Sequence, residues 1–105
     1  MILVTGASGF IGRNLIAFLS RRGLPVRALL RPSPYSSPLP RAMPVEVAVS
    51  SLQDEKGVRA ALKDVDCIFH LASAEKEGQH IDLEANDING LENLLLAADQ
   101  VGVKR

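Results

Sequence analysis

The stretch Thr5-Gly6-Ala7-Ser8-Gly9-Phe10-Ile11-Gly12 joins an apolar run, residues 1–4, to a pattern typical of a helix, Ile11–Arg22. Glycine tolerates positive φ and has no Cβ, so it suits a sharp reversal between a strand and a helix. The first N–H groups of such a helix have no partner within it, and they point outward with the positive end of its dipole. This geometry predicts a site for the pyrophosphate of a dinucleotide. The residues expected to contact it are Gly6, Ser8, Gly9, Phe10, Ile11 and Gly12.

The three glycines have different expected roles. Gly6 allows the tight turn, Gly9 lets a pyrophosphate approach the backbone, and Gly12 lets the helix pack closely on the sheet. Their spacing is G-x-x-G-x-x-G and differs from the usual dinucleotide fingerprint, G-x-G-x-x-G. The alternative interpretation is a glycine-rich turn that holds no ligand. A nucleoside triphosphate loop is excluded, because no G-x-x-x-x-G-K-[ST] occurs.

Length and composition indicate one domain, residues 1–105, with an aliphatic core, since 47% of the residues are hydrophobic and only 4% are aromatic. Twelve basic and twelve acidic residues cancel, so the charge favours neither nucleic acid nor an anionic membrane as a partner. No apolar stretch approaches the ~20 residues of a membrane helix. The single cysteine, Cys67, fits a reducing cytoplasm, and its apolar neighbours favour a small buried hydrophobe over a nucleophile.

Apolar periodicity predicts alternating strands and helices. The strands are expected over Met1–Thr5, Val26–Leu30, Val45–Val49 and Asp66–Leu71. Two helices are expected over Ile11–Arg22 and Leu83–Val101. Another helix is expected to begin at Gln53 or Asp54, with Val58, Ala61 and Leu62 on its inner face. Residues 32–44 hold five of the six prolines and predict an irregular loop. This alternation predicts an α/β fold, a Rossmann-like parallel sheet in strand order 3-2-1-4 with helices on both faces.

The first helix is expected to present an inward stripe to the sheet. Ile11, Leu15, Phe18 and Leu19 recur in it at helical spacing. We therefore expect these four side chains to pack on the strands.

The residue after the second strand of a dinucleotide fold lies beside the adenosine ribose. An acidic side chain there accepts hydrogen bonds from the hydroxyls of NAD, whereas an arginine pairs with the 2′-phosphate of NADP. This chain has Arg31 there and no Asp or Glu from Leu24 to Pro44. NADP is therefore favoured over NAD, and Arg13 offers a second positive charge near the same phosphate. The alternative for each arginine is a solvated surface cation.

Three segments resemble landmarks of the extended and atypical short-chain dehydrogenases/reductases, the family of the NAD-dependent epimerases and dehydratases. They are the T-G-x-x-G-x-x-G of Thr5–Gly12, His70-Leu71-Ala72, and the closing Gly90-x-x-Asn93-Leu94-Leu95 with Gly102-Val103-Lys104-Arg105. The resemblance implies that Leu71, Ala72 and Ser73 line the cofactor between adenosine ribose and nicotinamide. It also implies that His70 is a buried imidazole that forms a hydrogen bond and does not act as a base.

The sequence departs from this family in two binding segments. Ser51-Leu52 stands where members commonly carry an Asp-Leu pair whose carboxylate meets the adenine amino group, so the contact expected here is weaker. Asp87-Ile88 stands where extended members often have Asn-Val. Together with Arg31, this departure favours the atypical members that use NADP.

The catalytic Tyr-x-x-x-Lys of the family is missing, because the only tyrosine, Tyr35, is followed four residues later by Leu39. The family's fifth strand would start after Lys104-Arg105. The resemblance therefore implies the N-terminal half of a longer oxidoreductase or nucleotide-sugar epimerase/dehydratase, which binds cofactor without being catalytically complete. The alternatives are an NAD(P)-binding regulatory or assembly module and a fragment without a ligand. An uncovered strand edge predicts a homo-oligomer.

Overall fold

A computed structural model of the chain describes residues 1–7, 9–32, 45–71 and 83–105, of which 83–88 are described by their backbone alone. Each predicted strand and helix is present, with bounds within two residues of those expected. The elements are β1 (Ile2–Thr5), α1 (Phe10–Arg21), β2 (Val26–Leu30), β3 (Glu46–Val49), α2 (Glu55–Ala61), β4 (Cys67–His70) and α3 (Leu83–Val101). Most of the predicted proline-rich loop lies outside the described residues. None of the helices in the described part is long and apolar enough to cross a membrane.

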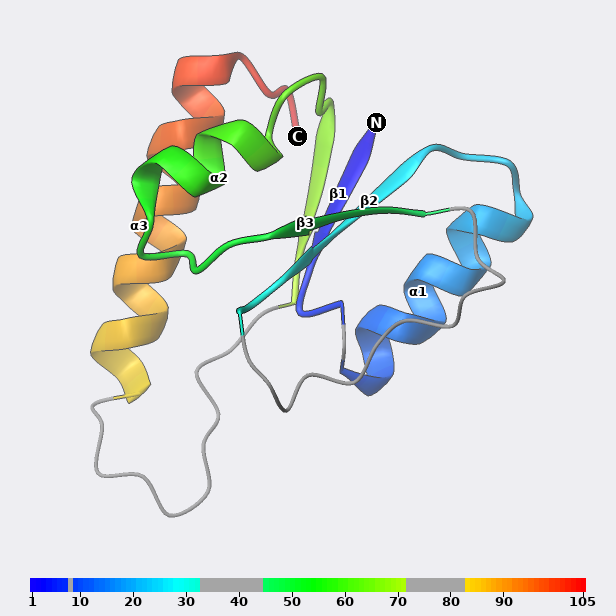
Figure 1. The fold of residues 1–105 in the computed structure, drawn as a ribbon, viewed down its shortest axis with the longest axis horizontal. Coiled ribbons are helices and arrows are strands. Elements are labelled where there is room, and N and C mark those ends of the chain that lie inside the picture. The colour runs from blue at the N-terminus through cyan, green and yellow to red at the C-terminus, as the bar shows by residue number, and fades with distance from the viewer. Residues whose placement is uncertain (8, 33–44, 72–82) are drawn as a thin grey trace.

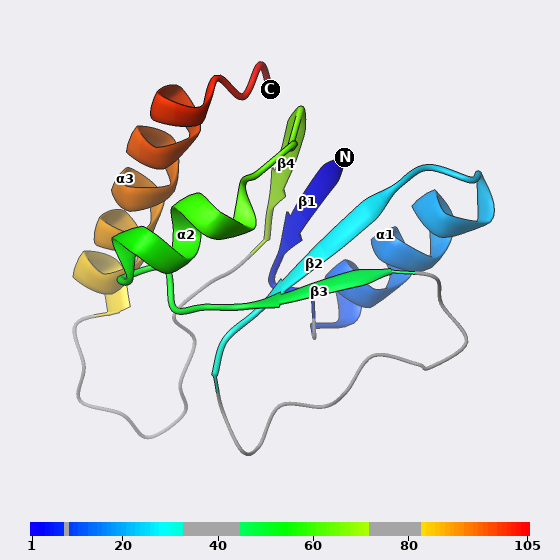
Figure 2. The same cartoon turned by 45° about the horizontal axis from the view of Figure 1, so that its top comes forward.

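The four strands form one parallel sheet in the order β3-β2-β1-β4, which confirms the predicted topology. α1 covers one face of this sheet, and α2 and α3 cover the other (Figures 1 and 2). The register pairs Thr5 with Leu29 on one side and with His70 on the other. The carboxyl ends of β1, β2 and β4 therefore meet at the same edge of the sheet.

The core has two sides because both faces of the central strands are covered. Neighbouring residues of β1 point to opposite faces, so Leu3 packs toward α2 and α3 while Val4 packs toward α1. This is why the central strands are mostly apolar, with Arg27 and Thr5 as their polar residues, instead of alternating regularly with polar residues. The predicted inner face of α2 is confirmed, since Val58, Ala61 and Leu62 are all buried.

The predicted inward stripe of α1 is wrong for two of its four residues. Ile11 is 67% exposed and Phe18 is 49% exposed, whereas the buried stripe runs through Gly12, Ile16 and Leu19. Both stripes have the same i, i+4, i+7 spacing, so periodicity alone does not distinguish them. The face that contains Gly12 turns inward because the helix approaches the preceding turn most closely there.

The end of α2 is held by a side chain from the sheet. Arg27 of β2 donates through Nη1 to the carbonyl oxygens of Ala61 and Lys63, each at 2.6 Å, and through Nε to Glu46 Oε2 at 2.9 Å. The last carbonyls of a helix lack partners within it, and a positive charge there is favourable. Arg27 thus fixes α2 on the sheet.

Arg105 pairs with the outer side of β4 at the start of the strand. The N–H of Arg105 donates to Asp66 O at 3.2 Å and the N–H of Ile68 donates to Arg105 O at 2.7 Å, the alternation of a parallel ladder. Nearby, the N-terminal ammonium lies 3.0 Å from the Asp66 carboxylate, and this hydrogen bond and charge lower the pKa of Asp66.

Candidate functional site

No described residue of the turn between β1 and α1 caps the start of the helix. Gly6 has a φ of +66°, in the left-handed region that favours glycine. Gly9 is the N-cap of α1, has no side-chain cap, and donates its N–H to Gly6 O at 3.1 Å. Within the described residues, the N–H groups of Phe10, Ile11 and Gly12 donate to no acceptor. No acidic side chain occupies the first turn of α1, so this helix start can accept an anion.

The fold requires glycine at two of the three predicted positions. A Cβ on Gly12 would clash with the carbonyl oxygen of Gly6 and lie 2.9 Å from Ala7 Cα, which confirms the predicted close approach. A Cβ on Gly9 would lie 3.4 Å from the same oxygen, and the Gly9 φ of −77° is available to any residue. Packing and backbone conformation therefore explain Gly6 and Gly12 but not Gly9.

Other predicted residues reach the same edge from the neighbouring strands. Arg31 directly follows β2 and is exposed, and Leu71 directly follows β4 with 38% of its surface exposed. Ser51 and Leu52 follow β3, whose register with β2 pairs Val49 with Leu30. The parallel register thus brings all four residues to the carboxyl edge, where the glycine turn lies.

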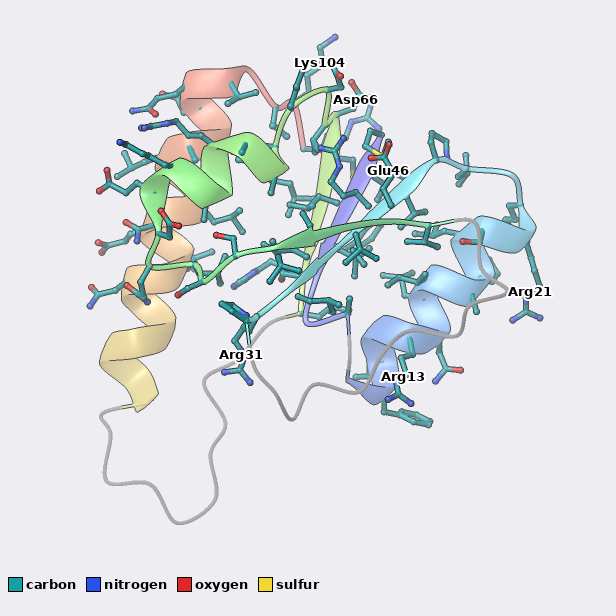
Figure 3. The ribbon with its side chains drawn as sticks, in the orientation of Figure 1. Arg13, Arg21, Arg31, Glu46, Asp66 and Lys104 are labelled. Atoms are coloured by element: carbon teal, nitrogen blue, oxygen red, sulfur yellow. The ribbon has the colours of Figure 1, made fainter. Side chains whose placement is uncertain are left out.

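The two predicted cations lie at this edge but are not brought together. Figure 3 shows Arg13 at the start of α1 and Arg31 at the end of β2, on different sides of the end of β1. The Nε atom of Arg13 is buried and has no hydrogen-bond partner in the described part of the chain. Glu46 and Asp66 lie toward the opposite edge (Figure 3). The labelled arginines at the carboxyl edge therefore lie far from these two carboxylates.

A hydroxyl joins the ends of β1 and β4 at the site. Thr5 is 1% exposed, its Oγ1 accepts the N–H of Leu71 at 3.0 Å, and the same oxygen lies 2.8 Å from His70 Nδ1. The prediction that His70 is a hydrogen-bonded imidazole is confirmed, although the ring is only half-buried. Sequence reasoning missed the role of Thr5, for which the only signal is a hydroxyl at the end of an apolar strand.

The loop after β3 is held by its own hydrogen bonds and by α3. Ser51 Oγ accepts the N–H of Gln53 at 3.1 Å, and Ser51 O accepts Ser50 Oγ at 3.0 Å and the N–H of Asp54 at 3.1 Å. Asn93 of α3 donates through Nδ2 to Leu52 O at 2.9 Å. Sequence reasoning found the closing motif that contains Asn93 but not this contact.

Three predicted site residues, Ser8, Ala72 and Ser73, lie outside the described residues. Their contacts with a cofactor stay predictions.

A matched pair of serine substitutions tests the account of the turn. We expect Gly12→Ser to lower the free energy of unfolding by about 2–3 kcal/mol, because the new Cβ overlaps the Gly6 carbonyl. Gly9→Ser should leave it within about 0.5 kcal/mol, because the site has room and serine is a good N-cap. Urea denaturation followed by circular dichroism measures both, and equal losses would contradict the assigned geometry.

The family described as NAD(P)H-binding matches residues 6–105. A 3-beta-hydroxysteroid dehydrogenase of Mycolicibacterium neoaurum is 34% identical over 99% of this chain and 30% of its own length. The chain spans about a third of the length of the curated relatives it matches.

Two solved structures share the fold. WbmG of Bordetella bronchiseptica, solved with NAD and UDP, superposes with a TM-score of 0.84 at 27% identity, over 99% of this chain and 35% of its own. UDP-glucose 4-epimerase of Thermus thermophilus, solved with NAD, gives a TM-score of 0.81 at 29% identity, over 97% of this chain and 34% of its own. The chain therefore belongs to the NAD(P)H-binding family and is an NAD(P)-binding domain of the short-chain dehydrogenase/reductase type.

Proposed function

We propose that residues 1–105 bind NADP in preference to NAD, as the cofactor-binding part of a short-chain-type oxidoreductase or nucleotide-sugar epimerase/dehydratase. The observation that carries this proposal is the open start of α1, where Phe10, Ile11 and Gly12 have N–H groups without an acceptor in the described residues. Gly9 supports it, because neither its φ nor its packing requires glycine. Close approach of a diphosphate to the backbone would explain why position 9 is glycine.

The other predicted site residues are assigned to successive parts of the cofactor. The diphosphate accepts hydrogen bonds from the first turn of α1, with Ser8 beside it. Leu71, Ala72 and Ser73 line the path toward the nicotinamide, and Ser51 and Leu52 contact the adenine. When bound, the nicotinamide gives or takes a hydride at C4, and this chain binds and orients it.

The preference for NADP depends on Arg31. Its side chain is exposed at the end of β2, and no acidic residue occurs between Leu24 and Pro44 to accept the ribose hydroxyls of NAD. The 2′-phosphate of NADP can pair with this guanidinium through charge-assisted hydrogen bonds. Arg13, whose Nε lacks a partner among the described residues, adds positive charge to the same edge.

These 105 residues bind the cofactor without turning over a substrate, because the only tyrosine, Tyr35, has Leu39 where the family has its lysine. For the whole protein, relatives such as the hydroxysteroid dehydrogenase and the UDP-glucose epimerase support hydride transfer on a hydroxyl or carbonyl carbon. An NAD(P)-binding regulatory or assembly module is the second candidate, because 105 residues without a Tyr-x-x-x-Lys are equally compatible with it. The free Cys67, half-buried in β4, supports a cytoplasmic location.

The cofactor preference is tested by titration of the chain with NADPH and NADH. We expect Arg31→Asp to weaken NADPH by at least about tenfold and NADH by less than about threefold, since only NADPH loses a charge-assisted pair. Arg21→Asp is the matched control, because Figure 3 shows Arg21 at the far end of α1. Equal losses of affinity for both cofactors would show that Arg31 does not contact the 2′-phosphate.

Gly9→Val tests binding of the diphosphate independently of the preference for NADP over NAD. Its side chain should weaken NADPH and NADH alike, because both carry the same diphosphate. If the wild-type chain binds neither cofactor, the proposed function is wrong.

We also propose that the chain forms a homo-oligomer through the outer edge of β4. Phe69 on β4 and Leu95 on α3 are apolar side chains that are 38% and 60% exposed. Exposed apolar side chains favour association with another protein surface. Light scattering should therefore give a multiple of the 11.3 kDa chain mass, and Phe69→Lys should shift it toward the monomer. A wild-type chain that stays at 11.3 kDa at high concentration contradicts this assignment.

A further inference from the structure

We propose that Asn93 of α3 is a positioning residue, which holds the loop 50–54 in the shape that receives the adenine ring. The inference rests on the proposed function, because it concerns the adenine end of the same site. Asn93 Nδ2 donates to Leu52 O at 2.9 Å and joins residues that are 41 positions apart. The side chain that supplies this bond is half-buried between α3 and the loop.

The hydrogen bonds within the loop determine its backbone conformation but do not attach it to α3. The carbonyl and hydroxyl of Ser51 accept from Ser50, Gln53 and Asp54, all within three residues. Asp54 in turn caps α2 by accepting the N–H of Gly57 at 3.2 Å. The hydrogen bond from Asn93 ties the loop to α3.

The close approach of α3 makes this bond possible. A Cβ on Gly90 would lie 3.2 Å from Leu52 Cβ and 3.3 Å from Leu52 Cδ1, closer than most such contacts. Gly90 and Asn93 lie on the same face of the helix, because residues three apart are neighbours there. Leu52 is thus fixed at two points, its side chain by Gly90 and its carbonyl by Asn93.

The position of this loop determines which part of the cofactor Asn93 affects. The N–H of Ser50 donates to Leu30 O at 3.0 Å, so the loop begins beside the strand end that carries Arg31. The glycine turn belongs to β1 and α1 and shares no hydrogen bond with the loop within the described residues. A displaced Leu52 should therefore impair the adenosine half of the site and leave the diphosphate half intact.

The experiment compares two probes that each occupy one half of the site, adenosine 2′,5′-bisphosphate and inorganic pyrophosphate. Asn93→Asp keeps the side-chain shape but replaces the amide donor by a carboxylate that repels the Leu52 carbonyl. Asn89→Asp is the matched control, because it makes the same charge change at an exposed position of the same helix. We expect Asn93→Asp to weaken the bisphosphate about fivefold relative to the control. Pyrophosphate binding should match the control, whereas a general loss of structure would weaken both probes.

Gly90→Ala is a second variant that does not depend on the amide. Alanine favours the helix, so α3 should form, while the added methyl group presses on Leu52. We expect the same selective loss of bisphosphate binding, and this variant decides the question if Asn93→Asp does not fold. Bisphosphate affinities within twofold of the control in the folded variants would overturn the inference while the proposed function stands. A wild-type chain that binds neither probe would overturn both.

Discussion

α1 lies closer to the turn that precedes it than any side chain at position 12 would permit, and the site depends on this approach. The contact of Gly12 with the Gly6 carbonyl fixes which face of the helix turns toward the sheet. Ile16 and Leu19 are buried as a result, and Ile11 and Phe18 are turned outward. The first N–H groups of α1 have no acceptor in the described residues, because no partner exists for them within the helix and Gly9 supplies no side-chain cap. The turn therefore orients α1 through Gly12 and leaves its start uncapped at Gly9.

The parallel register extends the effect of this turn to the whole carboxyl edge. Thr5 lies beside Leu29 and His70, so the residues that follow β1, β2 and β4 come to the same level. Thr5 secures one of these junctions through the N–H of Leu71, and Asn93 secures the loop after β3. At the opposite edge, Arg27 ties α2 to the sheet and Asp66 holds the N-terminal ammonium. The amino edge thus carries hydrogen bonds and ion pairs between elements, while the carboxyl edge carries the start of α1 and the guanidinium groups of Arg13 and Arg31.

The sequence predicts most of this fold because its signals are local. Strands and helices follow from periodicity, their order from the alternation, and the two structural glycines from the turn that they must form. The inward face of α1 could not be predicted, since Ile11, Leu15 and Phe18 have the same spacing as Gly12, Ile16 and Leu19. The contacts of Arg27 with Ala61 and of Asn93 with Leu52 join residues 34 and 41 positions apart. No local pattern records such pairs, because they depend on how the elements pack.

The central claim is that backbone N–H groups at the start of α1 hold the diphosphate. The most direct measurement is a ¹⁵N-resolved NMR titration of the chain with NADPH, in which each amide reports on its own hydrogen bond. The account predicts that the amides of Phe10, Ile11 and Gly12 shift most among the residues of α1, and that inorganic pyrophosphate alone shifts the same three. Saturation by NADPH with these three amides unmoved would contradict it.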